Sequence, residues 1–323
     1  MVTLDDIRKA QARLEGVALR TELIPFPNQH GQLYLKPENL QPVGAFKLRG
    51  AYNKIASLTD EQRRRGVIAY SSGNHAQGVA YAARALGVKA IIVMPSNAPR
   101  IKREATAAMG AEIVTVGLAS DERRAKAEAM AADHGYTIVP PYDDEQIIAG
   151  QGTMGLEILQ DLPQVETVLV PVGGGGMISG IASAIKLSEP RVRVIGVEPE
   201  LAADALASLR SGQIVALSAE QVSRSVADGL RTQSIGRANF EHIRKYVDDI
   251  VTVSDDEIRE AMRRLAENPM TVPEPSGAVG VAAFLFRQDE LPKANVSVAI
   301  VSGGNVEPEL LAQVKERKEF ART

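Results

Sequence analysis

Four consecutive glycines, Gly173 to Gly176, lie between the apolar run Val168–Val172 and a further apolar segment. At a strand-to-helix junction, backbone N–H groups without side chains around them can converge on an anion, and the helix dipole adds a favourable potential. The pattern therefore predicts a phosphate site, with a flexible or tightly packed turn as the alternative. It does not match the dinucleotide fingerprint Gly-x-Gly-x-x-Gly, because Ile178 and Ser179 occupy the places where the third glycine would fall.

A second strand-to-helix junction carries small polar residues, namely Ser71, Ser72, Gly73, Asn74 and His75. Hydroxyl, amide and backbone donors at the end of a parallel strand suit a carboxylate, whereas an ordinary Ser/Asn-capped helix is the alternative. By itself, His75 fits a capping or supporting role better than that of a base. The four histidines show no His-x-x-x-His spacing, which disfavours a zinc hydrolase.

A third candidate is Lys47, which lies between Phe46 and Leu48 ahead of an amphipathic stretch. Burial lowers the pKa of an ammonium group toward the range in which the amine is nucleophilic. A buried lysine near a phosphate site suggests a Schiff base. A surface lysine at the start of a helix is the alternative.

Composition excludes several classes of protein. The chain has 323 residues, 45% of them hydrophobic, and a net charge of −3. No basic block exceeds Arg63–Arg65, so we expect no nucleic-acid partner. The absence of cysteine excludes disulfides, iron–sulfur clusters and a cysteine nucleophile. With no signal-peptide pattern and no apolar run of about 20 residues, we expect no membrane association and a cytoplasmic location.

Short runs rich in Val and Ile alternate with longer amphipathic segments. We expect strands at Val67–Tyr70, Ala90–Met94, Glu112–Val116, Tyr136–Val139, Val168–Val172, Val192–Val197 and Val296–Val301. Helical patterns separate them, including Gln77–Leu86, Asp121–His134 and Met177–Leu187. This order predicts parallel sheets with crossover helices, so the expected fold class is α/β.

Helix-capping residues and candidate domain boundaries add detail to the expected fold. Ser254 and Glu257 form a capping-box pattern, and Gly135 follows a helical pattern as a C-terminal cap. The stretches Asp60–Arg65 and Pro140–Pro141 are candidate domain boundaries that enclose four of the expected strands. We therefore expect a small domain of residues 59–140 inserted into a large domain of residues 1–58 and 141–323.

Four segments can be taken together: Asn39–Ala51 (Asn-Leu-Gln-Pro-Val-Gly-Ala-Phe-Lys-Leu-Arg-Gly-Ala), Ser71–Gly78, Gly173–Met177 and Val301–Asn305. They resemble the serine/threonine dehydratase and serine racemase family of pyridoxal-phosphate (PLP) enzymes, which have the tryptophan-synthase-β-like fold. The resemblance covers essentially the whole chain, in the order and spacing of that family. It implies PLP as the cofactor, bound by the large domain.

The resemblance also implies a role for each position. Lys47 would carry the cofactor through a Schiff base, Phe46 would pack near its ring, and Asn74 would hydrogen-bond its phenolic oxygen. Ser302 would face the pyridine nitrogen. The phosphate would be held by Gly173, Gly174, Gly175, Gly176 and Met177, and the substrate carboxylate by Ser71, Ser72, Gly73, Asn74 and His75. Ala45 departs from the serine of many relatives, which leaves the substrate pocket less defined.

A divalent-cation site is implied as well. In metal-responsive members of the family, two carboxylates and an intervening carbonyl bind the ion, and the matching positions here are Glu198, Ala202 and Asp204. Three oxygen ligands with waters suit Mg²⁺, Mn²⁺ or Ca²⁺. The alternative is that Glu198 ends a strand and Asp204 caps a helix.

The implied reaction is dehydration of a 3-hydroxy amino acid, with L-threonine or L-serine as substrate and 3-hydroxyaspartate as a further candidate. Lys47 would remove the α-proton, the phosphate or Lys47 would protonate the departing hydroxyl, and a 2-oxo acid and ammonia would be released. Ser72 resembles the opposite-face acid/base of serine racemases, so racemisation is a second expected activity. Arg124 resembles an arginine of the racemase pocket, with a solvated helix arginine as the alternative.

Two other functions stay open. One is β-replacement on the same fold, and the other is a PLP- or amino-acid-binding regulatory protein without turnover. The intact Lys47, Asn74 and Ser302 argue against the regulatory protein. For all of these functions, the expected small-molecule partner is an amino acid. We also expect the protein to form a homodimer.

Overall fold

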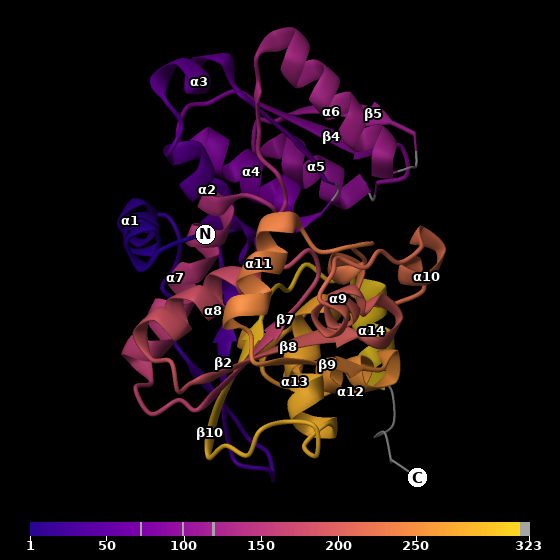
Figure 1. Cartoon of the computed structure of the whole chain (residues 1–323). Coiled ribbons are helices and arrows are strands. Elements are labelled where there is room, and N and C mark those ends of the chain that lie inside the picture. Colours follow the sequence, from indigo (N-terminus) through magenta and orange to yellow (C-terminus); the bar gives the residue numbers. More distant parts are fainter. Residues whose placement is uncertain (72, 99, 118–119, 317–323) are drawn as a thin grey trace.

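The computed structural model describes residues 1–71, 73–98, 100–117 and 120–316. Two sheets organise this part of the chain (Figure 1), one of six strands in the order β1-β2-β10-β7-β8-β9 and one of four in the order β5-β4-β3-β6. In Figure 1 the smaller sheet lies in the upper part of the molecule and the larger sheet in the lower part. The α/β class with parallel-rich sheets is confirmed.

The six-stranded sheet is parallel except at one edge. Its strands are β1 (Ile24–Phe26), β2 (Gln32–Pro37), β7 (Thr167–Pro171), β8 (Arg193–Pro199), β9 (Asp249–Val253) and β10 (Val296–Val301). Strand β1 pairs with β2 antiparallel, and β10 lies between β2 and β7, parallel to both. The four-stranded sheet is wholly parallel and consists of β3 (Val67–Tyr70), β4 (Ala90–Pro95), β5 (Glu112–Val116) and β6 (Thr137–Ile138).

Helices cover both faces of each sheet. In the first part of the chain they are α1 (Leu4–Leu14), α2 (Lys47–Ala56), α3 (Asp60–Arg65), α4 (Asn74–Ala85), α5 (Arg100–Ala108), α6 (Ser120–His134) and α7 (Glu145–Asp161). They continue with α8 (Gly176–Ser188), α9 (Asp204–Ser211), α10 (Ala219–Ser223), α11 (Arg237–Tyr246), α12 (Asp255–Leu265), α13 (Pro275–Phe286) and α14 (Pro308–Glu316). Short 3₁₀ turns are η1 (Glu38–Leu40), η2 (Glu200–Ala202), η3 (Asp228–Leu230) and η4 (Pro269–Thr271).

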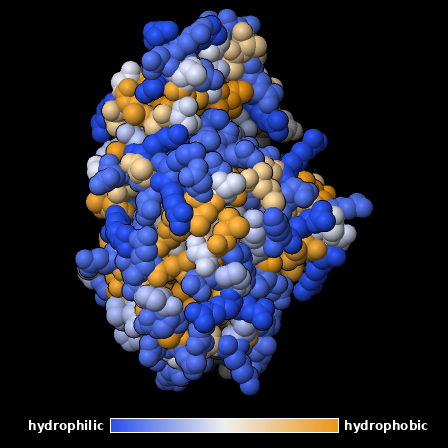
Figure 2. Space-filling model, turned by 60° about the vertical axis from the view of Figure 1, so that its left-hand side comes forward, coloured by the Kyte–Doolittle hydropathy of each residue, from blue (hydrophilic) through white to orange (hydrophobic). Residues whose placement is uncertain are grey.

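The buried side chains show that helices pack on both faces of each sheet. On one face of the larger sheet they come mainly from α12 and α13, and on the other from α7, α8 and α11. The smaller sheet packs against α2 and α4 on one face and against α6 on the other. Strands such as β4, β7 and β10 are buried at every residue, as expected for parallel strands between two helical layers. Polar side chains dominate the molecular face in Figure 2, with apolar residues in patches between them.

Most sequence expectations match these elements within a residue or two. The capping box of Ser254 and Glu257 opens α12, and Gly135 follows α6 at φ +72°. Strands β1, β2 and β9 were not expected, because β1 has only three residues and β2 contains a lysine and a proline. The stretch Asp60–Arg65, a candidate domain boundary, is a capped helix. The four enclosed strands do form one sheet, whereas the domain boundaries at 59 and 140 stay a prediction.

The sheet order positions the candidate site. Strands β7 and β10 are neighbours, and crevices beyond the carboxyl ends of parallel strands are the usual ligand sites of α/β proteins. The glycine run follows β7, and Ser302 follows β10. Ser71 follows β3 of the other sheet, and Asn74 and His75 begin α4. Within the described chain, no helix has both the length and the apolar character needed to cross a membrane.

Candidate active site

A cavity of about 600 Å³ lies where these strand ends meet. This volume falls within the range of small-molecule sites, roughly 300–1,000 Å³. The predicted site residues among its walls are Phe46, Lys47, Ser71, Gly73, Asn74, His75, Gly173, Gly174, Gly175, Met177 and Ser302. Gly176 begins α8 directly behind this wall. Ser72 lies outside the described residues.

Lys47 begins helix α2, and its amine points to the segment that links β6 to α7. The Nζ atom donates a hydrogen bond of 2.8 Å to the carbonyl oxygen of Pro141 and lies 5.1 Å from the centre of the Phe46 ring. Burial lowers the pKa of Lys47 to about 8, partly offset by the negative charge of Glu274. The alternative of a surface lysine is therefore wrong, and a substantial fraction of this amine is neutral near physiological pH.

The glycine loop presents bare backbone to the cavity. Within the described residues, the N–H groups of Gly173, Gly174 and Gly175 form no backbone hydrogen bond. A Cβ atom on Gly174 would lie 2.2 Å from the ring of Tyr142, and Gly175 has a φ of +93°. Only glycine satisfies both constraints. Donors without partners beside the N-terminus of α8 form the kind of site that holds a phosphate.

The turn after β3 leads into helix α4. The N–H of Gly73 donates to Oγ of Ser71 at 3.2 Å. His75 is buried and its Nε2 lies 2.9 Å from the carbonyl oxygen of Val139. Burial, and next the positive charge of Lys47, lower the pKa of His75 to about 3. The imidazole is therefore neutral and held by the backbone, which agrees with a supporting role rather than that of a base.

Ser302 and Asn74 occupy further parts of the wall. The Ser302 hydroxyl is buried and donates to the carbonyl oxygen of Ser276 at 3.4 Å. Asn74 Oδ1 accepts from Asn305 Nδ2 at 2.8 Å, and Asn74 Nδ2 donates to Glu274 Oε1 at 2.6 Å. The roles assigned to Ser302 and Asn74 stay predictions.

Several lining residues were not found from the sequence. Glu274 and Tyr142 come from segments with no recognised chemical motif, although the flanking prolines of Glu274 mark a rigid turn. Lys102 and Asp228 also line the cavity and form an ion pair of 3.2 Å across it. These residues are brought to the site by packing, and a local sequence pattern carries little signal for them.

Arg124 lies at the edge of the same cavity. Its Nε donates to Oε1 of Glu128 at 2.7 Å, one helical turn along α6, and its side chain is 64% exposed. This geometry supports the solvated helix arginine more than a fixed substrate ligand.

The predicted metal residues lie on consecutive elements, with Glu198 in β8, Ala202 in η2 and Asp204 at the start of α9. Glu198 is buried at the end of β8 and accepts hydrogen bonds from the N–H groups of Ala205 and Leu206, at 2.9 and 2.8 Å. Asp204 is also buried, and neither of its carboxylate oxygens has a hydrogen-bond partner of good geometry in the described chain. Burial raises the pKa of Asp204 to about 7, and burial and the charge of Asp204 raise the pKa of Glu198 well above its usual range.

This pair of buried carboxyls is not a cluster of the commoner metal-binding kind. No group of three or more His, Cys, Asp or Glu side chains suited to a metal occurs among the described residues. Burial of two carboxyls disfavours their charged forms, and a divalent cation bound between them and the backbone would offset that penalty. The donor set therefore fits a hard divalent cation.

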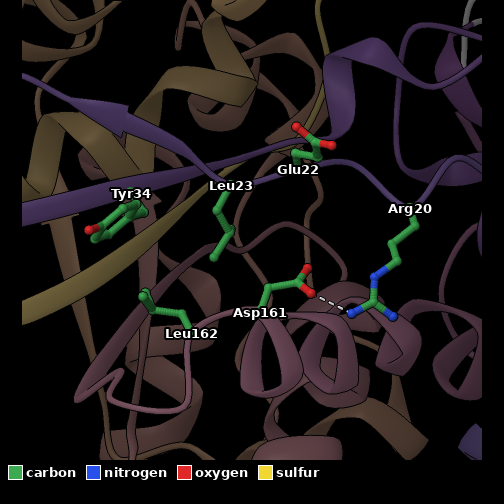
Figure 3. A pocket seen from close by; sticks show the side chains of 6 residues that line it. All are labelled: Arg20, Glu22, Leu23, Tyr34, Asp161 and Leu162. Carbon is green, nitrogen blue, oxygen red and sulfur yellow. Dashed lines mark hydrogen bonds and ion pairs between the residues drawn. The ribbon is translucent and has the colours of Figure 1, made fainter.

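A second cavity, of about 530 Å³, lies near the carboxyl end of α7 (Figure 3). Its walls are Arg20, Glu22, Leu23, Tyr34, Asp161 and Leu162. Arg20 and Asp161 form an ion pair, so their charges compensate each other. It contains none of the predicted catalytic groups, and we therefore take the cavity at Lys47 as the candidate active site.

The residues of that cavity fit PLP. A lysine with a lowered pKa suits the aldehyde, and the unpartnered N–H groups of the glycine loop suit the phosphate. The Ser302 hydroxyl and the Asn74 amide supply polar groups elsewhere on the wall. When bound at Lys47, PLP would supply an electron sink for the α-carbon of an amino acid.

Comparisons with known proteins agree with this assignment. A family model described as "Pyridoxal-phosphate dependent enzyme" matches residues 14–303. The L-threonine ammonia-lyase of Thermotoga maritima is 46% identical over 97% of this chain and 78% of its own length. The L-threo-3-hydroxyaspartate ammonia-lyase of Saccharomyces cerevisiae is 45% identical over 90% of this chain and 88% of its own. Maize serine racemase superposes with a TM-score of 0.91 at 37% identity, covering 97% of this chain and 96% of that one.

Proposed function

The chain belongs to the pyridoxal-phosphate-dependent enzyme family, and we propose that it is an ammonia-lyase that removes water from a 3-hydroxy amino acid. The observation that carries this proposal is the placement of Lys47 between the glycine loop and the Ser71–His75 turn, with its pKa lowered to about 8. Its relatives include ammonia-lyases for L-threonine and L-threo-3-hydroxyaspartate. The products would be a 2-oxo acid and ammonia.

Each part of the cavity has a task in this reaction. The glycine-loop N–H groups bind the phosphate, and donors at the start of α4 bind the substrate carboxylate. Lys47, once released from the cofactor, takes the α-proton as general base. With PLP bound, the Ser302 hydroxyl would be the group that faces the pyridine nitrogen, and as a neutral group it would not protonate that nitrogen. Such an environment would favour prompt loss of the β-substituent.

The decisive assay measures 2-oxo acid and ammonia over a panel of L- and D-3-hydroxy amino acids. We expect turnover of L-threonine, L-serine or L-threo-3-hydroxyaspartate by the wild type and none by Lys47→Ala. A β-replacement enzyme would instead need an added nucleophile such as sulfide and would return an amino acid. A regulatory protein would show ligand-dependent spectra without ammonia.

Serine racemisation is a second candidate activity, supported by the close superposition with maize serine racemase. Inversion needs a proton delivered to the face opposite Lys47, and we assign that delivery to Ser72. In Ser72→Ala, L-dehydration should persist while racemisation and elimination from D-substrates are lost. An equal loss of all three activities would leave Ser72 as a carboxylate binder only.

We also propose that a divalent cation, Mg²⁺, Mn²⁺ or Ca²⁺, binds to Glu198, the carbonyl oxygen of Ala202 and Asp204. The support is the pair of buried carboxyls, of which Asp204 has no hydrogen-bond partner for either oxygen among the described residues. A cation that binds only the native state stabilises it by ~2.7 kcal/mol at a hundredfold excess over Kd. EDTA should lower the Tm, Mg²⁺ or Mn²⁺ should restore it, and Asp204→Ala should respond to neither. Equal Tm values for the metal-free and Mg²⁺-loaded wild type would contradict this site.

Cytoplasmic location and homodimer formation, both expected from the sequence, are proposals as well. Cell fractionation and the mass of the purified protein in solution would test them.

A further inference from the structure

Glu274 is a buried carboxyl in the active-site cavity that the proposed reaction has not yet used. It precedes α13, between Pro273 and Pro275, at the position where a side chain often caps a helix. Its side chain forms no capping hydrogen bond and lies in the cavity wall instead. A rigid backbone thus holds an acidic group among the reacting residues.

A hydrogen bond from Asn74 holds one of the two carboxyl oxygens of Glu274. Asn305 Nδ2 donates to Oδ1 of Asn74, which determines which end of the Asn74 amide carries the hydrogens. One of those hydrogens goes to Oε1 of Glu274 at 2.6 Å, and the other is left for the cofactor. Within the described residues, Oε2 of Glu274 accepts no hydrogen bond, and the side chain lines the cavity. This second oxygen is therefore available to a substrate.

The electrostatic surroundings favour the protonated form of Glu274. Burial and the negative charge of Asp228 raise its pKa to about 8. The hydrogen bond from Asn74 and the positive charges of Lys102 and Lys47 oppose this shift without cancelling it. At neutral pH the group is mainly a neutral acid with a proton to give.

We propose that Glu274 is the general acid of the dehydration, donating a proton through Oε2 to the departing β-hydroxyl. This inference rests on the proposed ammonia-lyase function. The α-proton passes to Lys47, its electron pair forms the Cα–Cβ double bond, and the C–O pair leaves with the oxygen. The Glu274 proton completes a water molecule and leaves a carboxylate, which regains a proton from the ammonium of Lys47 or from solvent. Glu274 thus takes the role first assigned to the phosphate or Lys47.

The test compares two substrates that differ in their leaving group. L-serine loses hydroxide, which needs a proton, whereas 3-chloro-L-alanine loses chloride, which does not. Glu274→Gln preserves an oxygen for Asn74 but has no acidic proton. We expect kcat for L-serine to fall by about 10²-fold or more, the usual contribution of a general acid, while kcat for 3-chloro-L-alanine stays close to that of the wild type.

Four further measurements make the result specific. The visible absorbance of the bound cofactor should be unchanged in Glu274→Gln, and Glu274→Asp should recover part of the L-serine activity. Glu260→Gln, another buried carboxyl variant, should not alter the ratio of the two rates. In the wild type, the L-serine rate should fall as the pH rises through about 8, and the 3-chloro-L-alanine rate should not show that loss.

The possible results distinguish a wrong role for Glu274 from a wrong ammonia-lyase function. An equal loss for both substrates in Glu274→Gln would make Glu274 a structural residue and overturn the proposal. Unchanged activity toward L-serine would overturn it too. A wild type that releases no 2-oxo acid from any substrate would contradict the ammonia-lyase function itself, and the role of Glu274 with it.

Discussion

At the scale of the residue, Lys47 shows how position changes an ordinary amine. Its Nζ lies in the cavity wall, where it donates to the carbonyl oxygen of Pro141, and burial there disfavours the charged form of the amine. The pKa of about 8 follows from this burial. The same residue on an exposed helix would be protonated almost completely at neutral pH.

This shift predicts the pH dependence of cofactor binding. Only the neutral amine attacks an aldehyde, so the rate of PLP incorporation into cofactor-free protein should rise with pH through about 8 and then level off. Stopped-flow absorbance would follow the reaction, and borohydride reduction with peptide mass spectrometry should locate the adduct on Lys47. A rate that keeps rising to pH 10, or an adduct on another lysine, would contradict the assignment.

A second residue-scale prediction concerns Gly174. In Gly174→Ala the new methyl group would overlap the Tyr142 ring, so the loop must move and PLP affinity should fall. Adding Tyr142→Ala removes the overlapping ring, and the double variant should recover part of the affinity lost in Gly174→Ala. Equilibrium titration with PLP measures both. Additive losses in the double variant would show that the overlap is not the cause.

At the scale of the element, helix α2 must hold Lys47 in place, and a cluster of buried ion pairs anchors α2 to its neighbours. Arg49 forms ion pairs with Glu38 of η1 at 2.8 Å and with Glu157 of α7 at 2.6 Å, and Lys36 of β2 also contacts Glu157 at 2.6 Å. All four side chains are buried. Two positive and two negative charges compensate one another, and they join the four elements β2, η1, α2 and α7.

Removing one member of this group should be costly. Arg49→Met leaves Glu38 and Glu157 without their main partner, and breaking a buried pair in this way typically costs about 3–5 kcal/mol. Arg100→Met is the matched control, because Arg100 is 81% exposed and its pair with Glu104 is worth at most about 0.5 kcal/mol. Urea unfolding would measure both. A loss in Arg49→Met as small as that of the control would contradict an anchoring role.

At the scale of the whole molecule, the active-site cavity lies between parts that belong to different sheets. Lys102 is on α5, which packs against β5 of the smaller sheet, and Asp228 is in η3, beside the core of the larger one. Their ion pair crosses the cavity and is partly exposed, with side-chain exposures of 15% and 45%. It therefore links the two parts at the cavity wall.

Loss of this link should change substrate binding more than stability. A partly exposed ion pair contributes about 0–1 kcal/mol, so Lys102→Met should leave the free energy of unfolding almost unchanged and raise KM by up to about fivefold. Salt should raise KM in the wild type and have less effect in the variant. Lys89→Met, which removes an ion pair of 3.2 Å within the smaller sheet, is the control and should not change KM. Equal KM values for Lys102→Met and the wild type would contradict the link.

The amino-acid sequence by itself determined the elements and the local chemistry. Alternation of apolar runs and amphipathic segments predicted β3 and β10 at their observed bounds, because burial between two helical layers leaves a continuous apolar signal. The bounds of the edge strand β5 were predicted as well, although none of its residues is fully buried. The glycine run was recognisable because its constraint is local, namely a backbone without side chains. The lysine between apolar neighbours was recognisable because its constraint is local too, namely its position at the start of a helix.

Only the tertiary structure decided which distant groups meet. Asn74 and Glu274 are 200 residues apart, and Lys47 meets the carbonyl oxygen of Pro141 from 94 residues away. These contacts depend on β10 lying between β2 and β7, and on the smaller sheet facing the strand ends of the larger one. The pKa values of Lys47 and Glu274 follow from the burial and the neighbouring charges that this packing creates, and no short stretch of sequence encodes either.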